Sequence, residues 1–190
     1  MSLKSLPFVL LTTTLSVTPL EKPTQFQSLL SNLLTPQSST SRCHKPCSAD
    51  NALYSLIRRF EGFSPYTYLD SAGKPTIAFG HLIKRGEVFE EPITSQQAQT
   101  LLENDLKAAV GGVNKAVKVQ MRQNQFDGLS SFAFNVGTGT LQKSTLLKKV
   151  NAGKDVEVPP QFLRYSYAGG KRLNGLVVRR QAEANLYAGK

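Results

Sequence analysis

Apolar residues recur every three to four positions in several stretches of the chain, the spacing that places them on one face of an α-helix. This pattern predicts helices at 51–60, 94–109, 121–134, 145–151 and 175–187. Helix-end signals agree with these limits, since Thr94 and Gln97 match a capping box and Gly62 follows the first predicted helix. The second helix is expected to end at the glycine pair Gly111 and Gly112.

The pattern changes between the first two predicted helices. Strand-forming residues occupy 66–69 and 76–79, and turn-forming residues fill Ser71 to Pro75 between them. A β-hairpin is therefore predicted directly after the first helix.

Three polar residues mark this helix end and hairpin. Glu61 lies on the last helical turn, where Phe60, Phe63 and the negative helix end disfavour its ionisation, as suits a general acid. Asp70 and Thr76 flank the hairpin turn and can converge on one water molecule. Two acidic groups are the minimum requirement for glycoside hydrolysis. Taken singly, the same residues would also suit a solvated helix end, turn and strand.

The ordered series Glu61, Asp70, Thr76 and His81 within FEGFSPYTYLDSAGKPTIAFGH resembles the catalytic signature of the phage-type lysozymes, glycoside hydrolase family 24. Three later blocks are similar to the lambdoid and P22-type endolysin branch of that family: QFDGLSSFAFNVG, KSTLLKKVNAG and GGKRLNGLVVRRQAE. The resemblance extends from about residue 49 to the C-terminus.

The resemblance implies an α+β, lysozyme-like fold with a small β-hairpin lobe, a larger helical lobe, a long helix joining them and a cleft between them. It also implies an endolysin, a muramidase that hydrolyses the β-1,4 bond between N-acetylmuramic acid and N-acetylglucosamine in peptidoglycan. Glu61 would then protonate the glycosidic oxygen, while Asp70 and Thr76 would position water for an inverting attack. Such a mechanism requires carboxyl groups roughly 6.5–9.5 Å apart and no metal or organic cofactor.

The same resemblance suggests further residues at the cleft. Phe134 and Asn135 end a helix that lines the cleft in the family, so Asn135 is expected to bind a sugar N-acetyl group. The plain alternative for Asn135 is a helix-terminal residue before a glycine. An arginine of the last helix packs near the catalytic glutamate in the family. Arg179 or Arg180 is therefore expected to pair with Glu61, opposing the desolvation effect, or to bind substrate.

His81 and the two cysteines are assigned structural roles. Because Glu61 and Asp70 already supply both proton-transfer groups, His81 is expected to be a buried imidazole that holds the hairpin by hydrogen bonds. Cys43 and Cys47 have too few neighbouring ligands for a zinc site. They are expected to form a disulfide in an oxidising compartment, or to remain free thiols in the cytosol.

The first part of the chain reads as a targeting segment followed by a linker. Residues 1–20 carry Lys4 before the apolar run LPFVLLTTTLSV, which is typical of a signal peptide or a releasable signal anchor. This segment is predicted to associate transiently with the inner membrane and to export the protein to the periplasm and cell wall. The alternative is accumulation in the host cytoplasm and release through a holin. Residues 21–48 are predicted to be a linker with one short helix, and 49–190 the catalytic domain.

The protein is basic, with a net charge of +10. Such a field attracts polyanions. Without a recognisable nucleic-acid-binding motif, the anionic polymers of the cell envelope are better partners than nucleic acid. A monomer is expected. Three other functions remain open at this point: a lytic transglycosylase, a non-catalytic wall-binding module and a cationic membrane-disrupting protein.

Overall fold

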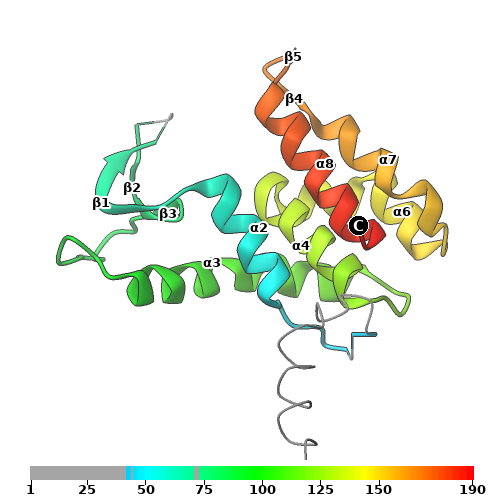
Figure 1. Ribbon diagram of the computed structural model, residues 1–190, viewed down its shortest axis with the longest axis horizontal. Coiled ribbons are helices and arrows are strands. Elements are labelled where there is room, and N and C mark those ends of the chain that lie inside the picture. The colour runs from blue at the N-terminus through cyan, green and yellow to red at the C-terminus, as the bar shows by residue number, and fades with distance from the viewer. Residues whose placement is uncertain (1–41, 44, 71–72) are drawn as a thin grey trace, which may run out of the picture. The chain divides into compact units, whose positions relative to one another are not determined.

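The computed structural model describes residues 42–43, 45–70 and 73–190, all within the compact unit Ser38–Lys190. The predicted targeting segment at 1–20 and most of the predicted linker lie outside the described residues. Helices dominate the described chain, and the strands form two small antiparallel sheets (Figure 1). The α+β class predicted from the sequence is confirmed.

The first helix, α2 (Asn51–Glu61), begins at Asp50 and ends before Gly62. It leads into a three-stranded antiparallel sheet of order β1-β2-β3, formed by β1 (Ser64–Leu69), β2 (Pro75–Ala78) and β3 (His81–Leu82). In the register of this sheet, Tyr68 lies opposite Thr76 and Ile77 lies opposite His81. The predicted hairpin is present, and β3 extends it by a strand too short for a periodicity signal.

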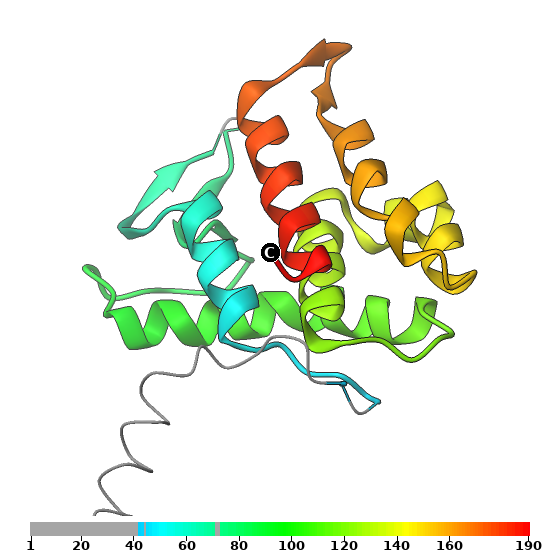
Figure 2. The same cartoon turned by 45° about the vertical axis from the view of Figure 1, so that its right-hand side comes forward.

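Helix α3 (Ser95–Ala116) underlies both the sheet and the other helices (Figure 1, Figure 2). Leu53 and Ile57 of α2 are buried against Leu102 and Leu106 of α3. Nearer its start, α3 packs beneath the sheet, where Ile77 is buried. The single long helix therefore fixes α2 and the sheet on a common support.

The prediction that this helix ends at Gly111 and Gly112 was wrong, because α3 continues through both glycines to Ala116. A Cβ atom at Gly112 would lie 2.3 Å from Cγ2 of Thr138. Glycine here permits close packing of α3 against Thr138, and the sequence pattern could not separate this role from that of a helix stop.

The remaining helices enclose the largest hydrophobic cluster. They are α4 (Gln123–Val136), α5 (Thr138–Lys143), α6 (Thr145–Asn151), the 3-10 turn η1 (Asp155–Glu157), α7 (Pro159–Phe162), the 3-10 turn η2 (Leu163–Tyr165) and α8 (Asn174–Ala188). Helix α4 lies at their centre, because every residue from 124 to 133 is buried. Phe126 and Phe132 of α4 belong to the same cluster as Phe162 and Tyr187.

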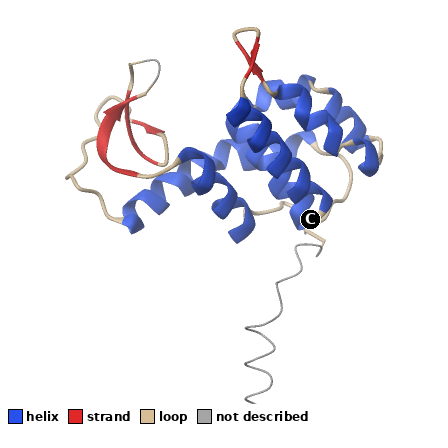
Figure 3. Ribbon diagram, turned by 45° about the horizontal axis from the view of Figure 1, so that its top comes forward, coloured by secondary structure: helices blue, strands red, loops and turns tan. Residues whose placement is uncertain are grey.

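A second, two-stranded sheet precedes α8. It pairs β4 (Tyr167–Ala168) with β5 (Lys171–Arg172) and stands apart from the first sheet (Figure 3). The sequence pattern did not predict it, since each strand holds only two residues. Its exposed Gly169 and Gly170 both have positive φ, so glycine suits this tight turn.

The two cysteines form a disulfide, and both are buried in the main hydrophobic cluster. Asn114 of α3 holds the segment, because its side chain accepts from the Cys47 N–H and donates to the Cys47 carbonyl, both at 2.8 Å. The packed structure thus begins before residue 49, where the sequence suggested that the catalytic domain starts.

None of the helices in the described ranges has the length and hydropathy needed to cross a membrane.

Candidate active site

Glu61 is placed by the helix that it terminates. The side chain of Asp50 accepts hydrogen bonds from the Ala52 and Leu53 N–H groups at 2.8 and 3.3 Å, which fixes the start of α2. At the other end, Gly62 has a φ of +73°, which lets the chain turn away into β1. The Glu61 side chain keeps 24% of its surface exposed, so it can meet both the protein interior and a ligand.

The arginine that meets Glu61 is Arg179 of α8. Its Nη1 donates to Oε1 of Glu61 at 2.6 Å, and its guanidinium lies over the ring of Phe60, 5.5 Å from the ring centroid. Both influences expected at Glu61 are therefore present: partial burial, which opposes a negative charge, and a cation, which favours it.

Arg180 turns the other way and is fully buried. Its Nη2 donates to Oδ1 of Asn135 at 2.8 Å, and its guanidinium lies 5.1 Å from the ring centroid of Phe132. The suggestion that Arg180 binds substrate is corrected by this burial, since α4 covers the face of α8 that carries it. Asn135 remains exposed with its carbonyl oxygen held by Arg180, whereas Phe134 packs partly buried between two hydrophobic clusters.

Asp70 and Thr76 lie on either side of the β1–β2 turn, as the sequence indicated. Oδ1 of Asp70 accepts from the Lys74 N–H at 2.9 Å, and the Asp70 N–H donates to the Lys74 carbonyl at 2.9 Å. Thr76 is buried, and its hydroxyl donates to the same carbonyl at 3.0 Å. Backbone contacts to Lys74 therefore hold both side chains in the turn.

A surface pocket of about 350 Å³ opens beside Glu61. The residues that line it come from the end of α2 and from the sheet: Glu61, Gly62, Phe63, Ser64, Tyr68 and Ala78. Phe63 and Tyr68 are 47% and 39% exposed, so aromatic surface is available next to the carboxyl group. A Cβ at Gly80 would lie 3.7 Å from Oε2 of Glu61, so the backbone at Gly80 borders the carboxyl group.

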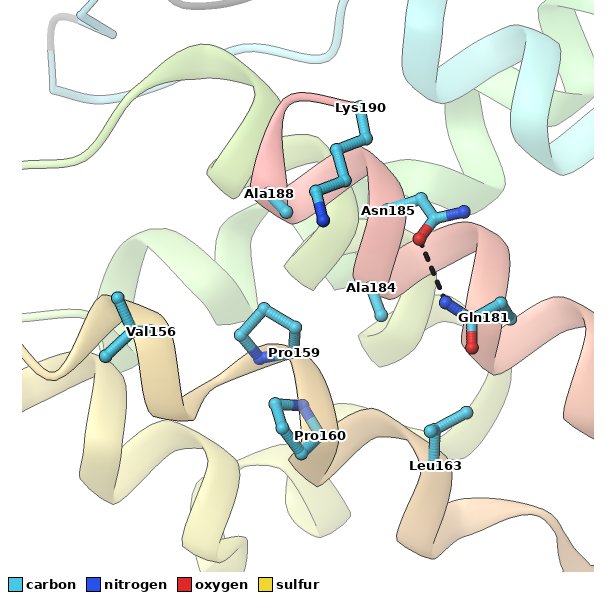
Figure 4. A pocket seen from close by; sticks show the side chains of 9 residues that line it. All are labelled: Val156, Pro159, Pro160, Leu163, Gln181, Ala184, Asn185, Ala188 and Lys190. Carbon is cyan, nitrogen blue, oxygen red and sulfur yellow. Dashed lines mark hydrogen bonds between the residues drawn. The ribbon is translucent and has the colours of Figure 1, made fainter.

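A second pocket, of about 360 Å³, lies between α8 and the segment from Val156 to Leu163 (Figure 4). Prolines, alanines and other neutral side chains form most of its wall, and Gln181 donates to Asn185 across its edge at 2.9 Å. It contains none of the predicted site residues and offers no acidic group for hydrolysis.

His81 is buried, and each of its ring nitrogens faces a carboxylate. Nδ1 lies 2.8 Å from Oδ2 of Asp105 on α3, and Nε2 lies 3.0 Å from Oε2 of Glu87. The Lys84 N–H and the imidazole of His81 hold the pKa of Glu87 below its ordinary value. The imidazole thus ties the sheet and the following loop to α3, beside the candidate site and away from its pocket.

Sequence reasoning missed the carboxylates that organise this region. Asp105 gave a signal, because it interrupts the apolar face of its helix and a charge at such a position needs a partner. Glu183 also gave a signal in the sequence, because it follows Arg179 and Arg180 by four and three residues, the spacing that makes side chains neighbours on a helix surface. Glu87 lies in a polar loop, where one more acidic residue carries no signal.

An acidic residue at a helix end, an open pocket lined by a small antiparallel sheet and a helical region built on one long helix together define a lysozyme-like protein. The Phage lysozyme family model matches residues 58–183. The chain belongs to the phage lysozyme family.

Solved structures of phage enzymes share this fold. The endolysin from Escherichia coli O157:H7 phage FAHEc1 is 36% identical with a TM-score of 0.68, over 74% of this chain and 92% of that one. A mutant of P22 lysozyme is 31% identical with a TM-score of 0.66, over 74% of this chain and 97% of that one.

Curated relatives agree with the structural neighbours. The endolysin of Bacillus phage PZA is 41% identical over 134 residues, covering 70% of this chain and 52% of the relative. The SAR-endolysin of Enterobacteria phage PA-2 is 36% identical over 123 residues, covering 65% of this chain and 74% of the relative. The chain thus spans about half the length of the Bacillus phage endolysins that it matches.

Proposed function

We propose that this protein is an endolysin that hydrolyses peptidoglycan, cleaving the β-1,4 bond between N-acetylmuramic acid and N-acetylglucosamine. The observation that carries the proposal is the placement of Glu61: a half-buried carboxyl group, oriented by Arg179, at the edge of an open pocket. Membership of the phage lysozyme family supports the same reaction class.

In the proposed mechanism, Glu61 gives its proton to the glycosidic oxygen as the bond from that oxygen to the anomeric carbon breaks. Water attacks the anomeric carbon from the opposite face of the sugar, and Asp70, with Thr76, takes up the proton that the water loses. This displacement inverts the anomeric configuration, which requires space for water between the two carboxyl groups. In this mechanism the aromatic rings of Phe63 and Tyr68, which line the pocket, would contact the glycan, and Asn135 would bind an N-acetyl group.

The test compares wild-type protein with Glu61→Gln on purified peptidoglycan, following loss of turbidity and weighing the released fragments by mass spectrometry. Removing a general acid lowers the rate by about 10²–10⁴-fold. Glu103→Gln, an exposed glutamate on α3, serves as the matched control and should clear peptidoglycan like the wild type.

Three results would contradict the proposal. Equal clearing by Glu61→Gln would remove Glu61 from the site and would fit a membrane-disrupting protein. Fragments ending in anhydro sugars would instead assign the chain to the lytic transglycosylases. Binding of peptidoglycan by the wild type without clearing would leave a wall-binding module.

We also propose that the protein acts outside the cytoplasm. The signal-like sequence of residues 1–20 supports export, and the Cys43–Cys47 disulfide is typical of an oxidising compartment. The net charge of +10 would then concentrate the enzyme at anionic envelope polymers, an attraction that salt weakens.

A further inference from the structure

A cluster of buried charges lies behind Glu61. The α8 charge cluster consists of Arg179, Arg180 and Glu183, which keep at most 5% of their side-chain surface exposed. Burying three charges is costly unless they pair with one another. The contacts among these three residues are therefore the interactions that offset the cost of burying their charges.

Glu183 is held from several directions. Its Oε1 accepts from the Ser131 hydroxyl of α4 at 2.9 Å, from Nη2 of Arg180 at 3.1 Å and from Nε of Arg179 at 3.3 Å. Its Oε2 lies 2.9 Å from Nε of Arg180. Oε1 therefore accepts all three hydrogen bonds, while Oε2 is held by its ion pair with Arg180 alone.

Burial raises the pKa of Glu183, and the two arginines and Ser131 oppose this effect. Burial likewise lowers the pKa of Arg180, while Glu183 opposes that change. Each charge in the cluster thus depends on its partners, so the loss of one changes the electrostatics of the others.

Arg179 connects the cluster to the pocket. One guanidinium bridges two carboxylates, with Nε on Glu183 and Nη1 on Glu61, above the ring of Phe60. The position of Glu61 therefore depends on where Glu183 holds Arg179. The positive charge of Arg179 is shared between the carboxylate of Glu183 and the carboxylate of Glu61 at the pocket.

We propose that Glu183 is a positioning residue for the reaction: it fixes the Arg179 guanidinium against Glu61 and takes up part of its charge, so that Glu61 is oriented without being locked in its ionised form. This inference rests on the proposed role of Glu61 as the general acid. Without Glu183, Glu61 would be the sole carboxylate partner of Arg179 among the ion pairs described, which favours the ionised form that has no proton to give.

The test replaces Glu183 by glutamine, which keeps the shape and an acceptor oxygen but removes the charge. We expect kcat on soluble peptidoglycan fragments to fall about 10- to 100-fold through misplacement of Glu61, with little change in KM. We also expect the alkaline limb of the pH–activity profile to move to lower pH. Ser131→Ala removes one hydrogen bond from Glu183 and should produce smaller changes in the same directions.

The matched control is Tyr187→Phe, one helical turn further along α8. Tyr187 is also buried, and its hydroxyl donates to Asp155 at 3.1 Å, away from Arg179. This variant should lower the melting temperature without moving the pH–activity profile, which separates positioning from simple loss of stability.

Titration of the Glu61 side-chain carboxyl by carbon-13 NMR provides a readout that does not depend on activity. In Glu183→Gln its midpoint should fall relative to the wild type. A folded Glu183→Gln protein with unchanged kcat, pH profile and Glu61 titration would overturn the inference. If that variant does not fold, an unchanged Ser131→Ala protein would overturn it instead.

Failure of the inference and failure of the proposed function are distinguishable. In the first case wild type and Glu61→Gln still differ in clearing while Glu183→Gln resembles the wild type. In the second case the wild type and Glu61→Gln clear equally, whereas the NMR titration continues to report on the link between Glu183 and Glu61.

Discussion

Asp127 carries its carboxyl group into the protein interior on α4. It is fully buried, accepts from Nε2 of Gln123 at 3.0 Å and hydrogen-bonds with the side chain of Asp50, which caps α2. Burial, followed by the neighbouring Asp50 carboxyl, raises the pKa of Asp127 to about 8. At neutral pH one proton is therefore retained between the central helix and the start of the helix that ends at Glu61.

Because folded Asp127 retains this proton, the free energy of unfolding depends on pH. Unfolded Asp127 loses its proton near its ordinary value of 3.8, while the folded protein keeps it to about 8. Stability therefore falls as pH rises between these values, by at most about 1.4 kcal/mol per pH unit. In Asp127→Asn the side-chain amide still donates to Asp50 but cannot ionise, so this contribution to the slope should disappear. Urea unfolding of both proteins from pH 5 to 8 measures it, and parallel profiles would contradict the prediction.

At the scale of elements, the support for the site is the contact between α4 and α8. A Cβ at Gly128 of α4 would lie 3.0 Å from the Glu183 carbonyl oxygen and 3.2 Å from the Tyr187 nitrogen. These are backbone atoms of α8, so they can move only if the helix moves. Gly128 therefore sets the distance at which α8 packs on α4.

Gly128→Ala should destabilise the protein by about 1–2 kcal/mol. Overpacking costs about 1–3 kcal/mol, and the helix propensity of alanine recovers part of this. Gly111→Ala on α3 is the control, because no atom lies within 4 Å of a Cβ there, and it should stabilise by about 0.5–1 kcal/mol. Denaturant unfolding of both variants checks the two signs. If the Gly128→Ala protein is as stable as the Gly111→Ala protein, α8 moves away from the added methyl group without a cost in stability, which would contradict the prediction.

Apolar periodicity predicted the helices of this protein but not its two-residue strands. The five helices that apolar spacing predicted within the described residues all exist, because each contributes apolar residues to a hydrophobic cluster. Strands β3, β4 and β5 hold two residues each, too few to show an alternation. A glycine pair was mistaken for a helix end, because spacing alone does not reveal the helix packed against it.

At the scale of the whole molecule, we propose that residues 1–20 direct the enzyme to its place of action. SAR-endolysins are among the relatives of this chain, and its first residues have the charge and apolar run of an export signal. Activity at the wall would then require no second protein to carry the enzyme across the membrane.

Deleting residues 1–20 should trap the protein in the cytosol and abolish lysis of expressing cells unless a separate membrane pore is supplied. Cell fractionation and culture turbidity measure this, with clearing of purified peptidoglycan confirming that the shortened protein still folds and cuts. Lysis by the deletion variant without any pore would show that these residues do not direct export.

The sequence by itself determined the family, the helices, the hairpin and the candidate residues Glu61, Asp70 and Thr76, because apolar periodicity and motif spacing are local properties of the chain. Only the tertiary structure decided that Arg179 faces Glu61 while Arg180 faces Asn135, since adjacent helical residues diverge by about 100° and these partners lie on other elements. The hydrogen bond from Ser131 to Glu183 likewise forms only when α8 packs on α4, because the two residues lie 52 positions apart in sequence.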